Sequence, residues 1–144
     1  MAHNAIEIGA QPQQVFDILA DPSTYPEWVV GDRAVRAIDP GFPAVGTRFH
    51  HSVGVGPLTV DDHTEVIDVE SPWRLELKGK FRPWGTARIV WLLHPRGPAT
   101  TFVTMLEGAG GLLSHAVVNP LTDPLIGARN ARTLQRLKEL AEAA

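Results

Sequence analysis

The chain has 144 residues, of which 44% are hydrophobic and 20% charged, and its formal net charge is −3. This length suits one domain that buries its own core, so we expect residues 1–144 to form a single domain. There is no cysteine, which excludes disulfides, thiolate catalysis and cysteine-ligated zinc. The acidic balance and the lack of a basic run argue against a nucleic-acid partner.

The N-terminus has neither the basic start nor the apolar run of a signal peptide. No stretch approaches the ~18 apolar residues that a membrane-spanning helix needs. We therefore expect a soluble, cytoplasmic protein with no membrane span.

The N-terminal part predicts one strand followed by short helices. Residues 4–9 alternate in polarity and place Ile6 and Ile8 on one face. A helix opening at Pro12 has an apolar side formed by Val15, Phe16, Ile18 and Leu19. Asp21-Pro22 ends it, because the residue before a proline disfavours helix. The proline-rich turn that follows carries Tyr25 and Trp28, which we expect to close one end of the core rather than to contact a ligand.

Six more strands are predicted, over residues 33–39, 46–53, 58–69, 73–78, 86–94 and 100–107. The clearest alternation places Trp73, Leu75 and Leu77 on one face, between charged neighbours. The turns between successive strands are short. Such strands pair antiparallel, because parallel pairs need a crossover of a dozen or more residues.

The last segment predicts a long amphipathic helix. One apolar stripe recurs at spacings of three and four, through Ile126, Asn130, Leu134, Leu137 and Ala141, and we expect Leu125, Ala128 and Leu140 to widen it. Asp123-Pro124 supplies a capping side chain and a proline for the first turn. A second such pair, Asn119-Pro120, predicts a short helical piece over 112–118 and then a kink. Sheet and helix together predict a two-layer α+β domain.

Four segments carry a resemblance to a known family, namely 15–21 (VFDILAD), 25–28 (YPEW), 71–75 (SPWRL) and 134–139 (LQRLKE). They resemble the START-like helix-grip (SRPBCC) superfamily and, within it, the bacterial polyketide cyclase/dehydrase and lipid-transport branch. The resemblance implies a curved antiparallel sheet of about seven strands wrapped on the C-terminal helix, with two short helices after the first strand. Members hold lipids, sterols, polyketides, quinones or plant hormones between sheet and helix, and a minority catalyse cyclisation or dehydration.

We therefore expect the chain to bind a hydrophobic small molecule, such as a lipid, polyketide or aromatic compound. The expected walls are Phe49, Val53, Leu75, Leu77, Ile89, Trp91, Leu93, Met105, Leu121 and Leu125. The alternative is a polyketide aromatase/cyclase that uses acid–base residues in the same cavity. No cofactor is expected, and the apolar patch at 112–118 is interpreted as a core lid or as a contact surface for a homodimer.

His51 and Glu107 are the candidates for acid–base chemistry. His51 shares the apolar phase of Phe49 and is expected to face inward, as a hydrogen-bonded core or rim histidine in preference to an acid–base catalyst. Glu107 is in phase with Met105 near the end of the last strand, where it could bind a ligand hydroxyl or cap the next helix.

The polar stretch 61–65 is expected to face solvent with Asp61, His63 and Glu65, unless a β-bulge reverses the phase. We expect no metal site, because no histidine pair has a metal-binding helical spacing. His50 and His51 are adjacent on a strand and point to opposite faces, so they cannot chelate one ion together.

Overall fold

The structure is a computed structural model that describes residues 2–55, 57–81, 85–109 and 123–144. Its elements are β1 (Ala2–Ile8), α1 (Pro12–Leu19), η1 (Pro22–Thr24), α2 (Tyr25–Trp28), β2 (Asp32–Ile38), β3 (Arg48–Val55), β4 (Leu58–Glu70), β5 (Arg74–Phe81), β6 (Gly85–Pro95), β7 (Thr101–Ala109) and α4 (Asp123–Ala143). The helical piece and contact patch predicted at 112–118 lie outside the described residues. None of the described helices combines the length and apolar composition needed to cross a bilayer.

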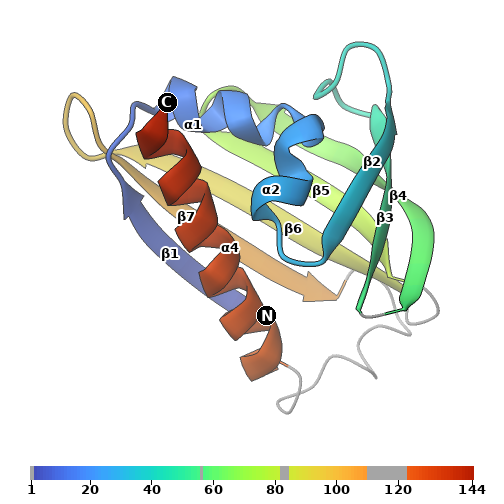
Figure 1. Cartoon of the computed structure of the whole chain (residues 1–144). Helices are drawn as coiled ribbons and strands as arrows, with labels where there is room; N and C mark the ends of the chain where they lie inside the picture. Colours follow the sequence, from blue (N-terminus) through green and yellow to red (C-terminus); the bar gives the residue numbers. More distant parts are fainter. Residues whose placement is uncertain (1, 56, 82–84, 110–122) are drawn as a thin grey trace.

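The seven strands form one sheet in the order β1-β7-β6-β5-β4-β3-β2, and every neighbouring pair is antiparallel. Strands β2 to β7 follow chain order, as their short turns require. The first strand adds to the far edge, beside β7. The sheet curves, and α4, α1 and α2 all lie on its concave side (Figure 1). The predicted α+β helix-grip architecture is confirmed.

The concave face of the sheet is apolar along most of its length. Cross-strand partners share a face, so the register sets rows of side chains, such as Val66, Leu77, Ile89 and Glu107 across β4 to β7. The buried cluster between sheet and helices includes Phe49, Leu75, Leu77, Trp91, Leu93, Val103, Met105, Leu134 and Leu137. This cluster is the core that fixes α4 against the sheet.

A bulge in β4 lies just after the polar stretch 61–65 and leaves the orientation of that stretch unchanged. The pairing of β4 with β5 shifts register between Val66 and Asp68. Before the shift, Asp62, Thr64 and Val66 are buried, and the side chains predicted to be outward are indeed outside, namely Asp61, His63 and Glu65. After it, Val69 packs on the core. The bulge therefore reverses the phase, but only beyond the polar cluster.

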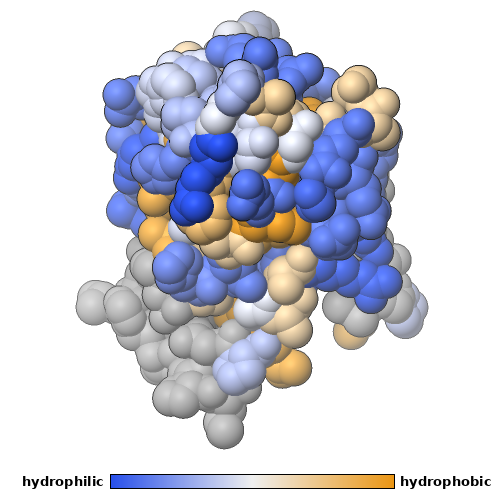
Figure 2. Space-filling view, turned by 90° about the vertical axis from the view of Figure 1, so that its left-hand side faces the viewer, coloured by the Kyte–Doolittle hydropathy of each residue, from blue (hydrophilic) through white to orange (hydrophobic). Residues whose placement is uncertain are grey.

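The buried stripe of α4 is narrower than predicted. Asn130, Leu134, Leu137 and Ala141 are buried, which confirms the stripe itself. Leu140 packs against the core, as predicted, but Leu125 is 72% exposed and Ala128 is exposed as well. At about 100° per residue, Leu125 lies about 140° around the helix from Asn130 and cannot face the sheet. Seen from the side on which β1 and α4 lie, the surface is mainly hydrophilic with some apolar side chains near its middle (Figure 2).

Polar contacts tie α4 to β1 at both ends of the helix. Near its start, the Asn4 Nδ2 donates to the Gly127 carbonyl at 3.0 Å. Near its end, the Glu142 carboxylate accepts from the Gly9 N–H at 2.7 Å and from the Lys138 ammonium at 2.5 Å. The hydrogen bonds from Lys138 and from Gly9 lower the pKa of Glu142.

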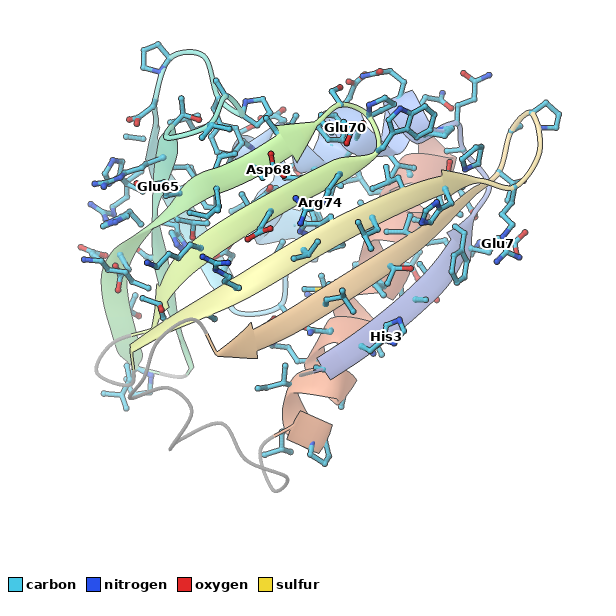
Figure 3. The ribbon with its side chains drawn as sticks, turned by 180° about the vertical axis from the view of Figure 1, so that it is seen from behind. His3, Glu7, Glu65, Asp68, Glu70 and Arg74 are labelled. Atoms are coloured by element: carbon cyan, nitrogen blue, oxygen red, sulfur yellow. The ribbon has the colours of Figure 1, made fainter. Side chains whose placement is uncertain are left out.

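The convex face of the sheet carries a network of ion pairs on β4, β5 and β6. Arg74 donates to Asp68 and to Glu76 at 2.5 and 2.7 Å, and Arg88 lies 3.2 Å from the other Glu76 oxygen. Asp68 and Arg74 are among the side chains labelled on this face in Figure 3. The prediction for Trp73 was wrong, since it is 43% exposed. Trp73 lies in the turn before β5, where its backbone N–H donates to the Glu70 carbonyl. The alternation of buried and exposed side chains therefore starts only at Leu75.

Candidate functional site

The concave face is incompletely covered towards the β5–β6 hairpin. Gly79 and Ala87 pair across these strands and are partly exposed, as is Ile89, whereas Trp91 one row away is buried. Among the described residues, only the Thr64 hydroxyl oxygen would lie within 4 Å of a Cβ placed on Gly79. Within the described part of the chain, the small side chains at 79 and 87 therefore leave space above this part of the sheet.

The opposite end of the concave face is filled by aromatic rings. Tyr25 and Trp28 from α2 are buried there, as predicted, with ring centroids 5.1 Å apart. Tyr25 also lies edge-on to Phe49 at 5.1 Å, and Trp28 edge-on to Trp91 at 5.7 Å. Burial is the main cause of a raised pKa for Tyr25, whose hydroxyl donates to the Leu19 carbonyl. A ligand on this face would therefore lie nearer Gly79 than α2.

The predicted wall residues divide into three groups. Phe49, Leu75, Leu77, Trp91, Leu93 and Met105 belong to the buried cluster, and Ile89 packs against it. Leu125 does not join them because it points to solvent. Leu121 and the side chain of Val53 lie outside the described part of the structure.

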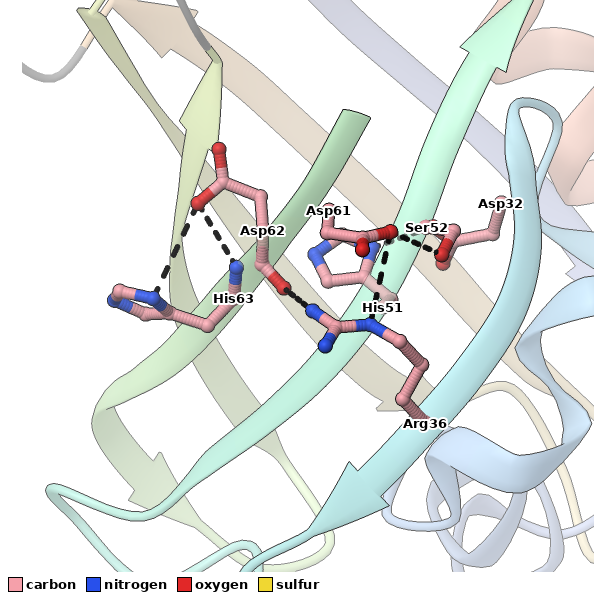
Figure 4. Close-up of polar contacts among 7 residues, drawn as sticks. All are labelled: Asp32, Arg36, His51, Ser52, Asp61, Asp62 and His63. Carbon is pink, nitrogen blue, oxygen red and sulfur yellow. Dashed lines mark hydrogen bonds and ion pairs between the residues drawn. The ribbon is translucent and has the colours of Figure 1, made fainter. Parts of the chain in front are cut away.

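His51 faces inward, as predicted, and both of its ring nitrogens contact buried polar groups. Figure 4 draws His51 with Asp32 and with polar side chains of the neighbouring strands. The His51 Nδ1 is 2.7 Å from the Asp32 Oδ1, and its Nε2 is 2.9 Å from the Thr64 hydroxyl oxygen. A carboxylate only accepts, so Nδ1 carries the proton in the neutral ring and Nε2 accepts from Thr64. Asp32 thereby orients the ring and leaves the basic nitrogen directed at Thr64.

Asp62 lies directly across from His51 in the register of β3 and β4 and is buried. Its Oδ1 accepts from the His63 N–H at 2.9 Å, and its carbonyl accepts from Arg36 at 3.4 Å. Partial burial, followed by the positive charges of Arg48 and Lys80, lowers the pKa of the outward-facing His63. Sequence reasoning missed Asp62 and Thr64, although the outward phase of 61, 63 and 65 implied that 62 and 64 face inward.

Glu107 also faces inward, at the end of β7, and it is paired. Both of its carboxylate oxygens accept from the Arg129 Nη2 at 2.5 Å. Arg129 further donates to the Asn130 Oδ1 from Nε at 3.3 Å and from Nη2 at 3.2 Å. The pair links the last strand to the first turns of α4, and the guanidinium charge compensates that of the buried carboxylate.

The two polar centres lie on opposite sides of the concave face. His51 is on β3 and Glu107 on β7, which are four strands apart. At about 4.8 Å per strand, this is about 19 Å measured along the sheet. The two groups therefore contact different parts of any bound molecule and do not act together on one bond.

A shallow groove lies elsewhere, at the β2 edge of the sheet. It has a volume of about 480 Å³, opens to solvent, and is lined by Ser23, Pro26, Ala34, Val35, Arg36, Ala37 and Ile38. None of the predicted site residues lines it. Over the same described residues, no three side chains of His, Asp or Glu are arranged to hold a metal ion.

Solved structures show how widely this fold is shared. A START superfamily protein from Mycobacterium smegmatis superposes with a TM-score of 0.80 at 15% identity, over 99% of this chain and 97% of that one. A conserved protein from Geobacillus kaustophilus gives 0.72 at 18% identity, over 98% and 94%. The di-domain ARO/CYC StfQ from the steffimycin biosynthetic pathway gives 0.72 at 14% identity, over 99% of this chain and 44% of that one. At these identities the likeness establishes the fold alone.

No curated protein matches the sequence. The family model described as polyketide cyclase / dehydrase and lipid transport matches residues 2–142, which is nearly the whole chain. The chain has the START-like helix-grip fold and belongs to the polyketide cyclase/dehydrase and lipid transport family.

Proposed function

We propose that the protein binds a hydrophobic small molecule, of the lipid, polyketide or aromatic kind, on the concave face of the sheet beside α4. The observation that carries the proposal is that the exposure of the side chains increases along that face. Leu77 and Met105 belong to a buried apolar wall, which gives way to the open, partly exposed area over Gly79 and Ala87. Polar groups flank that area on two sides, at Thr64 and at Glu107.

The energetics favour an apolar ligand with few polar groups. Apolar surface removed from water contributes about 25 cal/mol per Å², and a small number of polar contacts then sets the orientation. The Glu107 and Asp32 carboxylates already have partners, because Glu107 forms an ion pair with Arg129 and Asp32 accepts a hydrogen bond from His51. A ligand therefore needs no charge of its own.

Thermal-shift measurements and native mass spectrometry with fatty acids, sterols, naphthalene derivatives and aromatic polyketides test the proposal. We expect at least one class to raise the melting temperature and to appear as a one-to-one complex. A Gly79→Leu variant, which fills the open area, should lose that complex. The absence of any complex across the panel would reject the proposal.

A second function, an acid–base enzyme of the polyketide cyclase type, is favoured by the Asp32–His51–Thr64 chain. The carboxylate fixes the imidazole, and the hydroxyl links its basic Nε2 to the open area over Gly79. A base so oriented could take a proton from an enolisable carbon between two carbonyls, directly or through Thr64. Holding a poly-ketone chain close to its attack geometry would supply the rest of the rate enhancement.

Conversion of a poly-β-ketone substrate distinguishes the enzyme from the binding protein. We expect His51→Ala and Thr64→Val to lower turnover by about 10²-fold or more, the usual contribution of a positioned acid–base group. His63→Asn and His50→Asn on the convex side serve as controls and should leave the rate unchanged. Turnover that survives both His51→Ala and Thr64→Val would reject the acid–base mechanism.

A further inference from the structure

Thr64 lies where the buried part of the concave face meets the open area. In the register of the sheet it is placed between Phe49 on β3 and Gly79 on β5, and Ala87 on β6 continues the same row. Phe49 and Thr64 are buried, whereas Gly79 and Ala87 are partly exposed and carry no group larger than a methyl. The Thr64 side chain is therefore the polar group at the border of the open area.

There is space beside the hydroxyl oxygen of Thr64. A Cβ placed on Gly79 would lie 3.4 Å from that oxygen. Apart from the chain neighbours of Gly79, no other described residue has a heavy atom within 4 Å of that position. Hydrogen bonds between hydroxyl groups are about 2.8 Å long, so a ligand hydroxyl above Gly79 can reach the Thr64 oxygen.

The hydrogen bonds behind Thr64 determine what its hydroxyl can still bind. The Asp32 carboxylate only accepts, so the neutral His51 ring carries its proton on Nδ1, 2.7 Å from the Asp32 Oδ1. The His51 Nε2 therefore accepts, and the Thr64 hydroxyl donates its single proton to it over 2.9 Å. Within the described residues no group donates to the Thr64 oxygen. This oxygen can thus accept a further hydrogen bond but has no proton left to donate.

This polarity discriminates between the polar groups of an apolar ligand. A phenol, an enol or an alcohol can donate to the Thr64 oxygen. A ketone carbonyl or an ether offers only lone pairs, which would face another lone pair. An ammonium can donate, but burying its charge beside Leu77 and Ile89 costs more than one hydrogen bond returns. The group that fits is a neutral hydroxyl.

We propose that Thr64 selects the ligand by accepting a hydrogen bond from a phenol, enol or alcohol hydroxyl, with Asp32 and His51 fixing the direction in which Thr64 donates. This inference rests on the proposed binding function and names the polar group that the bound molecule carries. The hydroxyl of the ligand lies at Thr64, and its apolar body extends over Gly79 and Ala87. A ketone at the same position is disfavoured, because the Thr64 oxygen then stays unpaired.

Binding of 2-naphthol, 2-methoxynaphthalene and naphthalene to the full chain tests the proposal, by fluorescence titration and calorimetry. The first compound can donate a hydrogen bond, the second can only accept one, and the third does neither. The wild type should bind 2-naphthol about 10-fold more tightly than either of the others, the effect of one net hydrogen bond. In Thr64→Val this preference should fall to about one, whereas Thr64→Ser, which keeps the hydroxyl, should retain it.

A double variant tests the direction of the hydrogen bonds. Asp32→Asn combined with His51→Phe removes the ring nitrogen to which Thr64 donates. The Thr64 proton is then free for the ligand, so 2-methoxynaphthalene should gain affinity relative to 2-naphthol. An unchanged ratio of the two affinities in this variant would show that His51 does not set the polarity of Thr64, and would overturn that part of the proposal.

Thr104→Val is the matched control, because it removes a buried threonine hydroxyl on the face of β7 opposite to Met105 and should keep the wild-type preference. Melting curves establish that each variant folds. Equal binding of 2-naphthol and 2-methoxynaphthalene to the wild type, or a preference that survives Thr64→Val, would overturn the Thr64 site and leave the binding function intact. Failure of all three compounds to bind the wild type would contradict the site together with the proposed binding of aromatic compounds.

Discussion

Arg129 on α4 donates from Nη2 to both carboxylate oxygens of Glu107 on β7, at 2.5 Å. The carboxylate is buried, whereas the guanidinium side chain is 37% exposed. This asymmetry determines what each partner contributes. Glu107 depends on the pair for compensation of its charge, while Arg129 could be solvated without it.

Replacing Arg129 by Met should therefore destabilise the fold by about 2 kcal/mol, less than the 3–5 kcal/mol typical of a fully buried pair because water reaches the guanidinium. Adding Glu107→Gln in the same chain should recover part of the loss, since no buried charge then remains. Urea denaturation measures both. Arg132→Met, at an exposed position of the same helix, is the control, and an equal effect of the two arginine variants would contradict the prediction.

The Asp32–His51 contact likewise contains a buried carboxylate that depends on its partner. His51→Phe leaves the buried Asp32 carboxylate without its 2.7 Å partner, and we expect a loss of about 2–3 kcal/mol in unfolding free energy. The double variant Asp32→Asn, His51→Phe should be more stable than His51→Phe alone, because the uncompensated charge is gone. Chemical denaturation of the wild type, the Asp32→Asn and His51→Phe single variants and the double variant checks this. Additive effects of the two substitutions would show that the groups do not interact.

Gly79 allows the open area to be filled directly. Gly79→Ala should be tolerated or slightly stabilising, because a Cβ there meets only the Thr64 hydroxyl oxygen among the described residues, at 3.4 Å. Gly79→Leu should occupy the space and lower the affinity for naphthalene by about 10-fold or more. Lys80→Leu adds the same side chain at the exposed neighbouring position and should leave binding unchanged. Unaltered affinity in Gly79→Leu would place the ligand elsewhere.

Glu142 predicts a specific acid sensitivity. Its pKa is lowered from the ordinary 4.5, first by the Lys138 hydrogen bond and then by the Gly9 N–H. A carboxylate whose pKa is lower in the folded state stabilises the fold above its unfolded pKa, and this contribution is lost as the pH falls through the folded pKa. Unfolding measured between pH 3 and pH 6 should thus show a shallower acid loss for Glu142→Gln than for the wild type. Gln135→Ala, at an exposed site on α4, should retain the wild-type slope.

Local sequence patterns were sufficient for most of the fold. The two-residue period of residues 75–77 and 89–93 identified strands with one apolar face, and the facing of His51 followed from that of Phe49. The predictions of burial were wrong where the apolar pattern was extended beyond the strand or beyond the buried side of the helix. Trp73 precedes its strand, and Leu125 lies on the opposite side of the helix from Asn130, so their apolar character does not report burial.

The sequence by itself determined which side of each strand and helix is apolar, because that property depends only on neighbours within the same element. It also carried enough family-specific segments to identify the fold. Which polar groups meet was decided only by the tertiary structure. Asp32, His51 and Thr64 come from three strands, and Glu107 meets Arg129 across 22 residues of chain. Such contacts depend on strand register and on how α4 lies against β1, and these arise from packing over the whole molecule.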